Sequence, residues 1–260
     1  MNLPDDQVHV YLLSVAALTD PKLRAQLEAC LEKGERQRYQ QMRSREAAEQ
    51  YLLGRAGLRQ LLAFHHPGRN PQDWRFSTLS GGRPILLDDA GMPSELSFNV
   101  THVADRLAIA LCRSAHVGID LEAGRRAVDS GGIAARYFCS CEREMLMQLD
   151  GEARERYFLQ LWTLKEASVK ADGVGLAGFM GKRCFSIHDG RLSHQLHDQP
   201  EYRARHWQFR QYLLEDDLSL LALALQCQQS DVGIACRIFD WVPVRDANEL
   251  FPRLLASSTV

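Results

Sequence analysis

Hydrophobic and polar positions repeat with two different periods along this chain, and each change of period marks the boundary of an expected element. The opening apolar run predicts a strand from His9 to Leu13, and helical spacing follows from about Pro21 to Met42 and from about Arg45 to Phe64. The segment HHPGRNPQDW then ends the helical pattern. Short strand-like runs separated by Gly, Pro and Asp follow at Pro84 to Leu87, Leu96 to Val100, Leu107 to Cys112 and Val117 to Leu121.

The second half of the chain repeats this order, with helical spacing first and strands afterwards. The helical pattern runs from about Ile133 to Asp172 and is interrupted near Asp150. Within it, Ser140 suits an N-cap, the acids that follow Ser140 suit the first turn of a helix, and Gly173 suits a helix stop. Further strands are predicted at Arg183 to Ile187, Trp207 to Leu214, Leu218 to Gln226 and Ile234 to Trp241.

A weak internal repeat relates the two halves of the chain. The segment ERQRYQQM, from Glu35, resembles EREMLMQL, from Glu142. The segment YLLGRAGLRQLL, from Tyr51, resembles YFLQLWTLKEASVK, from Tyr157, at an offset of about 106 residues. Each copy follows a strand-like run and precedes further strands, and no linker rich in Pro, Gly or Ser divides the chain. The sequence therefore predicts an α+β fold built from two similar α+β halves packed together.

Composition and charge narrow the class of protein. With 260 residues, 45% of them hydrophobic, the chain can bury a substantial core. A net charge of -2 with interspersed signs gives no reason to expect nucleic acid or a membrane surface as a partner. Seven cysteines, an odd number, and a start without a secretory signal predict reduced thiols in the cytoplasm. No apolar run reaches the roughly 20 residues that a membrane helix needs, so we expect a soluble protein.

Two pairs of charged residues are candidates for chemistry. Asp120 and Glu122 stand two apart at the end of an apolar run, so an extended backbone points both carboxylates to one side. Glu166 and Lys170 stand four apart in a helical stretch and share a helix face. Three acids beside a cation form a coherent site for Mg²⁺ and a phosphate. Taken singly, an Asp-x-Glu at the end of a strand is more often a solvated turn, and a Glu-Lys pair four apart is more often a surface salt bridge.

Other signals point away from competing classes of enzyme. The chain has no GxxxxGK[ST] loop, no strand-linked GxGxxG and no GxSxG elbow, which leaves P-loop, dinucleotide-binding and serine-hydrolase chemistry without support. Cys139 and Cys141 have no second Cys/His pair at the spacing that a zinc site requires, so a structural zinc site is not expected. Trp162 shares a helical face with Phe158, which favours a core anchor over a stacking platform.

The order of five motifs indicates one particular family. The motifs are GRP from Gly82, SFNVTH ending at His102, VGIDLE from Val117, RYFCSCERE from Arg136 and LWTLKEASVKADGVGL from Leu161. This order resembles the Sfp-type 4'-phosphopantetheinyl transferases over about residues 35 to 188. The resemblance includes that family's (V/I)GID(I/L)E and (F/L)xxxWxxKEAxxKxxGxGL patterns, and the second of these is long and specific.

The resemblance implies a fold and a reaction. The family's fold is a pseudodimer of two α+β halves, which here correspond to residues 1–114 and 115–260, with the active site at their interface. The family transfers the phosphopantetheine arm of coenzyme A to a serine of an apo acyl or peptidyl carrier protein, with Mg²⁺, and releases adenosine 3',5'-bisphosphate. A cytoplasmic monomer that needs no covalent enzyme intermediate is expected.

The resemblance also assigns roles to the acids and to Lys170. By position, Asp120, Glu122 and Glu166 match the acids that hold Mg²⁺ with the pyrophosphate of coenzyme A, and Glu166 also matches the general base for the carrier serine. Lys170 matches the cation that neutralises charge on the departing phosphate. Lys165 is expected to assist with a phosphate.

A second set of residues matches positions that contact the nucleotide. His102 matches a histidine at the 3'-phosphate, and Thr101 stands where many relatives have serine. Arg38 and Arg83 match basic positions near the nucleotide phosphates, with Arg83 replacing a common lysine, and arginine suits phosphate by its fork geometry. Gln50 departs from the pattern, since some relatives carry a basic residue there, and the alignment around Arg38 can slide.

Three questions remain open at this level. Glu142 matches an acid of the family's K-x-E segment, but a helix macrodipole explains an acid there equally well. The carrier is expected to dock in part on the region from Val128 to Leu149, where Met145 or Met147 suits an apolar contact although helical Met is more often core. Two rival functions are a silent module that binds coenzyme A or a carrier, and a metal-dependent phosphohydrolase.

Overall fold

The computed structural model describes residues 3–123, 129–173, 181–196, 206–214, 219–227 and 233–258. The chain divides into two compact units: the first contains residues 1–77, 84–113 and 234–251, and the second contains residues 78–83, 114–233 and 252–260. The α+β class is confirmed. The predicted halves, 1–114 and 115–260, differ from these units chiefly because 234–251 joins the first unit.

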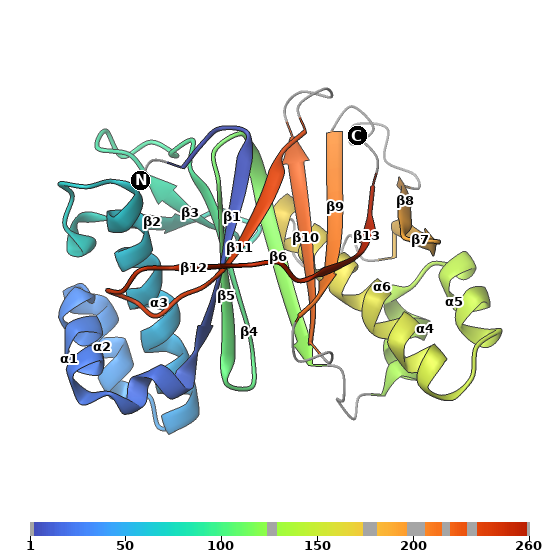
Figure 1. The fold of residues 1–260 in the computed structure, drawn as a ribbon, viewed down its shortest axis with the longest axis horizontal. Helices are drawn as coiled ribbons and strands as arrows, with labels where there is room; N and C mark the ends of the chain where they lie inside the picture. Colours follow the sequence, from blue (N-terminus) through green and yellow to red (C-terminus); the bar gives the residue numbers. More distant parts are fainter. Residues whose placement is uncertain are drawn as a thin grey trace. The chain divides into compact units, whose positions relative to one another are not determined.

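The first unit is built on a five-stranded sheet in the order β12-β11-β1-β5-β4, and a separate two-stranded sheet pairs β2 with β3 (Figure 1). The strands are β1 (Gln7–Ser14), β2 (Arg75–Thr78), β3 (Pro84–Leu87), β4 (Ser97–Val103), β5 (Arg106–Cys112), β11 (Ala235–Asp240) and β12 (Asn248–Leu250). The helices are α1 (Pro21–Cys30), α2 (Lys33–Gln41) and α3 (Arg45–His65), with 3-10 turns η1 (Val15–Thr19) and η2 (Pro71–Asp73).

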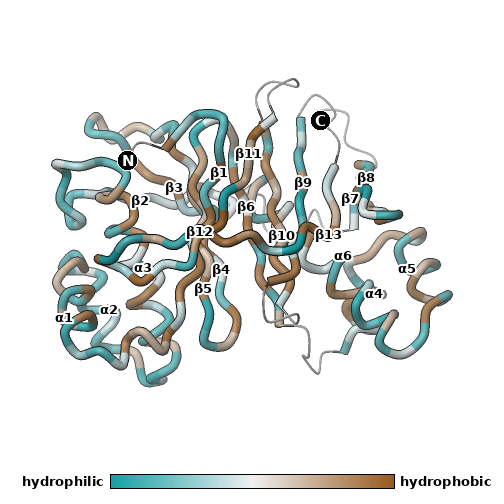
Figure 2. The backbone as a smooth tube through the Cα atoms, viewed as in Figure 1, coloured by the Kyte–Doolittle hydropathy of each residue, from teal (hydrophilic) through white to brown (hydrophobic). Residues whose placement is uncertain are grey.

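The second unit is built on a six-stranded sheet in the order β6-β10-β9-β13-β8-β7. Its strands are β6 (Ala115–Ala123), β7 (Arg183–His188), β8 (Arg191–Leu196), β9 (His206–Leu213), β10 (Ser219–Cys227) and β13 (Arg253–Ser257). Its helices are α4 (Ser130–Tyr137), α5 (Ser140–Met147) and α6 (Gly151–Asp172). Figure 2 shows hydrophobic residues along β10, all of whose residues are buried.

Helix boundaries follow from local chemistry, with two differences from the predictions. The predicted helix from Pro21 to Met42 is interrupted, because Leu31 takes an extended conformation and Glu32 begins α2 with a capping box. The N-cap of α5 is Cys139 instead of Ser140. Gly173 ends α6 in the left-handed conformation with φ 73°, as predicted for a helix stop.

The internal repeat is visible in the strand pairing of the two units. In the first unit β1 pairs antiparallel with β5, and β5 pairs antiparallel with β4. In the second unit β6 pairs antiparallel with β10, and β10 pairs antiparallel with β9. Among the described residues, each unit thus has an opening strand, three α-helices and then a returning pair of strands in the same order, as the sequence repeat predicts.

A buried ion pair also occurs at matching positions of the repeat. In α2, Glu35 accepts the N–H of its N-cap residue and binds Arg59 of α3, with Oε2 to Nε at 2.7 Å. In α5, Glu142 accepts the N–H of its N-cap residue and binds Lys165 of α6, with Oε2 to Nζ at 2.8 Å. Each pair therefore ties the start of a short helix to the middle of the long helix of its unit.

The sequence missed the four strands β2, β8, β12 and β13. These strands have three to six residues, and β2, β12 and β13 carry mostly exposed or half-buried side chains, so period-two hydrophobic alternation is weak in them. The predicted strand at Ile234 to Trp241 exists as β11, and it pairs in parallel with β1. Sequence periodicity cannot reveal such a pairing, because the partners lie at opposite ends of the chain.

Two further properties bear on the sequence predictions. Cys139, before α5, and Cys184, in β7, form a disulfide with a Cα–Cα distance of 5.8 Å, whereas all thiols were expected to be reduced. The prediction was wrong for this pair, since the packing of α5 against β7 brings two cysteines of distant sequence together.

No helix among the described residues has the length and apolarity to cross a membrane.

Candidate active site

The candidate site is built where α6 packs on β6, within the second unit, and Gly118 makes that contact possible. A Cβ added at Gly118 would lie 2.0 Å from the backbone oxygen of Ala167 and 2.4 Å from the backbone nitrogen of Ala171. Only the absence of a side chain permits this approach. Because side chains alternate along a strand, Asp120 and Glu122 leave β6 on the same face as Gly118, toward α6.

Lys170 of α6 holds the first acid of the predicted pair. Its ammonium lies 2.7 Å from Oδ1 of Asp120 and donates to the backbone oxygen of Ile119 at 3.2 Å. Asp120 is buried, whereas the Lys170 side chain is partly exposed. The ammonium is thus fixed at the acids and keeps some access to solvent.

Trp162 holds the second acid. Its indole Nε1 donates to Oε1 of Glu122 at 3.1 Å, and Glu122 is buried. Trp162 precedes Glu166 by four residues and Lys170 by eight, so the three side chains share one face of α6. Trp162 packs against the core, as predicted, and its ring also carries a polar contact to a candidate site residue.

Glu166 has a perturbed carboxyl group at this face. Burial raises its pKa, the carboxylates of Asp120 and Glu122 raise it further, and Lys170 opposes them, so that its pKa lies at about 7. A pKa near neutral is a property that a general base needs. Two carboxylates of β6 therefore act electrostatically on one carboxyl of α6, which brings negative charge to the place where the two elements pack.

The donor chemistry of these three residues fits a hard cation. Carboxylate oxygens are preferred ligands of Mg²⁺, and the raised pKa of Glu166 shows negative charge that a cation would neutralise. Among the described residues, however, no three His, Cys, Asp or Glu side chains are gathered closely enough to form a ready metal site. The structure therefore places the predicted ligands on facing elements, and their role as ligands stays a proposal.

Lys165 does not fit its predicted role at a phosphate. Its side chain is fully buried, its ammonium binds Glu142 at 2.8 Å, and it donates to the backbone oxygen of Arg183 at 2.6 Å. Burial lowers the pKa of Lys165 and raises that of Glu142, while their mutual attraction opposes both shifts. The prediction is corrected for this reason: Lys165 is a partner inside the fold, and Glu142 has a structural role there.

Arg83 lies in the same unit as the acids, at the C-terminal end of α6. Its Nη1 donates to the backbone oxygen of Ala171 at 2.7 Å, and a Cβ added at Gly173 would lie 3.0 Å from the Cβ of Arg83. The arginine of the GRP motif is therefore ordered against the helix that carries Glu166 and Lys170, and it is only half-buried.

The remaining predicted contacts to the nucleotide belong to the first unit. Arg38 is exposed on α2, and its guanidinium lies 5.3 Å from the ring centre of Tyr51. On β4, Thr101 is buried and His102 is exposed, because adjacent residues of a strand face opposite sides. Gln50, where the sequence departs from the family pattern, donates to the backbone oxygen of Ala104 at 2.8 Å.

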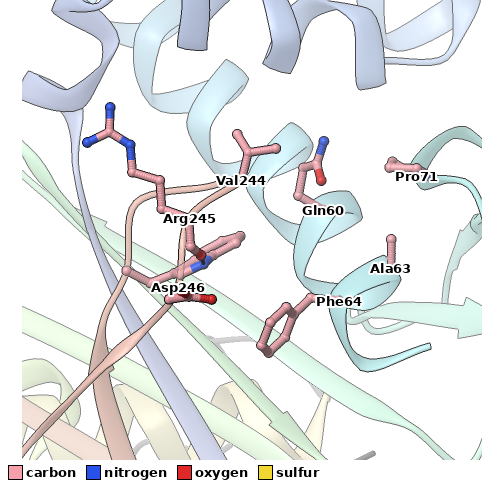
Figure 3. Close-up of a pocket in the computed structure, with 8 residues that line it drawn as sticks. Gln60, Ala63, Phe64, Pro71, Val244, Arg245 and Asp246 are labelled. Atoms are coloured by element: carbon pink, nitrogen blue, oxygen red, sulfur yellow. Dashed lines mark hydrogen bonds between the residues drawn. The ribbon is translucent and has the colours of Figure 1, made fainter. Parts of the chain in front are cut away.

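The first unit also contains a pocket of about 450 Å³. Figure 3 shows Gln60, Ala63 and Phe64 along one side of α3, with the loop of residues 244–246 opposite them. No predicted site residue lines this pocket, so it is not assigned to the predicted chemistry.

Comparison with known proteins places the chain in a family. The profile of the 4'-phosphopantetheinyl transferase superfamily matches residues 116–224, which include all but the first residue of β6 and the whole of α6. The chain is 33% identical over 178 residues to the 4'-phosphopantetheinyl transferase HetI of Nostoc sp., covering 68% of this chain and 73% of HetI. It therefore belongs to the 4'-phosphopantetheinyl transferase family of enzymes, and the resemblance drawn from the motifs is confirmed.

Two further relatives have the same activity in their names. The 4'-phosphopantetheinyl transferase Sfp of Bacillus subtilis is 32% identical over 155 residues, which are 59% of this chain and 66% of Sfp. The L-aminoadipate-semialdehyde dehydrogenase-phosphopantetheinyl transferase of Rattus norvegicus is 32% identical over 148 residues, which are 54% of this chain and 47% of that protein.

Sequence reasoning missed two residues of the site, Trp162 and Gly118. The spacing of Trp162, Glu166 and Lys170 at intervals of four residues could have placed the indole on the face with the acids. The glycine that precedes the acids of VGIDLE could have indicated a close approach of another backbone.

Proposed function

We propose that this enzyme transfers the 4'-phosphopantetheine arm from coenzyme A to a serine of an apo acyl or peptidyl carrier protein and releases adenosine 3',5'-bisphosphate. The observation that carries the proposal is the arrangement of three acids and one lysine on β6 and α6, in a chain of this family. Asp120, Glu122 and Glu166 would hold Mg²⁺, which when bound neutralises pyrophosphate charge.

Glu166 supplies the base in this proposal. A carboxylate with a pKa of about 7 is partly ionised near neutral pH, and it accepts the proton of the carrier serine as the serine oxygen attacks phosphorus. Lys170, held by Asp120, presents a fixed positive charge for the phosphate that departs. Preorganised charge of this kind stabilises the transition state without reorganisation during the reaction.

The nucleotide is proposed to contact basic residues of both units. Arg83 is favoured in the second unit, because its guanidinium is already ordered by the carbonyl of Ala171 and its side chain stays half-exposed. In the first unit His102 and Arg38 are exposed and available for phosphate, while buried Thr101 is the weaker candidate. A monomeric state and a cytoplasmic location remain parts of the proposal.

The function is tested by incubating the purified protein with coenzyme A, Mg²⁺ and a panel of apo carriers, and then measuring the intact mass of each carrier. A gain of about 340 Da, the formula mass of the arm, is expected on at least one carrier. Glu166→Gln and Asp120→Asn are expected to abolish the gain with the fold intact, because each removes charge with little change in volume. If no carrier in a broad panel gains mass, the proposal is wrong.

Two controls separate the rival functions. A silent binding module would retain coenzyme A in a binding assay and modify no carrier. A phosphohydrolase would release phosphate or nucleotide from coenzyme A without any carrier, which chromatography of the nucleotide products detects. Size-exclusion chromatography with light scattering tests the monomer.

A further inference from the structure

We propose that Trp162 is a positioning residue, whose indole N–H fixes the carboxylate of Glu122 for its role at the active site. The inference rests on the proposed function, because it takes Glu122 to be one of the acids that hold the cation. It concerns a contact that is already present in the protein alone, the hydrogen bond from Nε1 to Oε1 at 3.1 Å.

The ring of Trp162 is well placed to hold an acid in one orientation. It stacks on Phe158 at 6.4 Å between centroids with an interplanar angle of 8°, and Tyr137 lies at 6.0 Å with an angle of 56°. An indole N–H can only donate, so the direction of the bond cannot reverse. A donor fixed by aromatic packing limits rotation of the buried Glu122 carboxylate.

Trp162 and Lys170 each bind one of the two acids of β6. Lys170 binds Asp120 from one end of the α6 face, Trp162 binds Glu122 from the other, and Glu166 lies midway between the two donors in sequence. Each acid of β6 therefore has one oxygen directed by a donor from α6.

The chemistry of the two donors differs in a useful way. The ammonium of Lys170 brings positive charge to Asp120, whereas the indole N–H of Trp162 orients Glu122 and brings no charge of its own. A neutral donor can thus hold a carboxylate in one orientation without itself competing with a divalent cation for the negative charge. Removing a residue that hydrogen-bonds a metal ligand typically lowers metal affinity by about 10- to 100-fold.

The test measures binding of Mn²⁺, as a spectroscopic substitute for Mg²⁺, by electron paramagnetic resonance on the purified full chain in the absence of substrates. Trp162→Phe keeps an aromatic ring and removes the N–H, and it is expected to weaken Mn²⁺ binding by about 10-fold. The matched control is Trp207→Phe, because the buried Nε1 of Trp207 finds no hydrogen-bond partner among the described residues. That control is expected to bind Mn²⁺ as the wild type does.

A double-variant comparison separates positioning from simple damage to the fold. If Trp162 acts through Glu122, then Trp162→Phe has little further effect on Mn²⁺ binding in a Glu122→Ala background. Equal Mn²⁺ affinity in the wild type and a folded Trp162→Phe variant overturns the inference. A loss of the same size in both backgrounds also overturns it.

A separate measurement tests the same hydrogen bond and does not require the Trp162→Phe variant to fold. The ¹⁵N-indole signal of Trp162 is expected to shift upfield in Glu122→Ala, because the N–H loses its carboxylate acceptor. An unchanged signal shows that the bond is absent. If the wild type binds no Mn²⁺ and modifies no carrier, the proposed function itself fails, which is a different outcome from equal binding by both forms.

Discussion

In the proposed mechanism Glu166 serves as a base, while the carboxylates of two other acids lie near it. The same burial and charge that raise its pKa to about 7 also make its ionised form costly in the absence of a cation. Lys170 relieves part of that cost, and the residue-scale chemistry of the site is a balance between these two influences. The balance gives Glu166 a measurable pH dependence.

Activity is expected to rise with pH below about 7, because the base must be ionised to accept a proton and a bound cation lowers the pKa of a carboxyl beside it. Stability of the cation-free protein moves in the opposite direction. A carboxyl whose pKa is raised from 4.5 to about 7 binds a proton more tightly when folded, so stability is lost as pH rises through that window. After allowance for solvent screening, the loss is about 1–2 kcal/mol.

Urea unfolding at pH 5 and pH 8 measures this change, with Glu166→Gln as the control that removes the titrating group. The variant is expected to lose less stability over this interval than the wild type. Identical pH dependence in the two proteins would contradict the assignment of the raised pKa to Glu166.

The Lys165 ion pair supports a second prediction at this scale. Lys165→Met leaves the carboxylate of Glu142 buried without its ammonium, so the free energy of unfolding is expected to fall by about 3–5 kcal/mol. Adding Glu142→Gln is expected to restore part of that loss, because the uncompensated charge is removed. Urea unfolding measures both variants. A contact with phosphate would instead raise the KM for coenzyme A and leave stability unchanged.

At the scale of elements, the packing of α6 on β6 brings the acids and their donors together. The small residues Ala222 and Ala224 of β10 pair with Asp120 and Gly118 of β6, so the sheet beneath the helix carries little side-chain bulk. The sequence predicted both elements and the shared face of each acid pair. It could not predict the distance between the elements, which depends on the backbone contact at Gly118.

Gly118→Ala tests this contact. The added methyl group meets backbone atoms of α6 that cannot rotate away, so the helix must shift. We expect a loss of about 3 kcal/mol in stability and at least a 10-fold loss of transfer activity. Gly181→Ala is the matched control, since its new Cβ meets no described atom within 4 Å. Normal activity in a folded Gly118→Ala variant would show that the close approach is not required.

At the scale of the whole molecule, the motifs predicted the family and most elements, and the repeat predicted the similar order of the units. The membership of residues 234–251 in the first unit was not predictable, because it depends on pairing between the two ends of the chain. The role of Lys165 was misread because the motif fixes its position along α6 and not the direction of its side chain. Two neighbouring charged residues of α6, Lys165 and Glu166, can therefore have different roles, the first in the core and the second at the proposed site.

Carrier recognition belongs to this scale, and the structure describes most of the region proposed for docking, although Val128 lies outside the described residues. A hollow of about 140 Å³ lies there, lined by residues of α4, α5 and α6 that include Arg143, Arg154 and Met147. Met147 is 72% exposed, while Met145 is half-buried. An exposed methionine beside a hollow suits contact with an apolar side chain of a partner, so we favour Met147 as the contact.

Met147→Glu is expected to raise the KM for the carrier by about 10-fold without changing stability or the KM for coenzyme A, because it adds charge to an exposed apolar contact. Steady-state kinetics with one accepted carrier measures these quantities. Met92→Glu is the matched control, since Met92 is 61% exposed in the other unit. Equal carrier kinetics for both variants would place the docking surface elsewhere.

The parallel pairing of β11 with β1 has a consequence for how the protein is made. During synthesis, β1, β4 and β5 leave the ribosome early and can form three strands of a sheet, but the partner of the outer edge of β1 follows more than a hundred residues later. An open edge invites pairing with other chains. The newborn protein therefore has an interval in which its first sheet is vulnerable to aggregation, and slow or interrupted translation before residue 240 lengthens that interval.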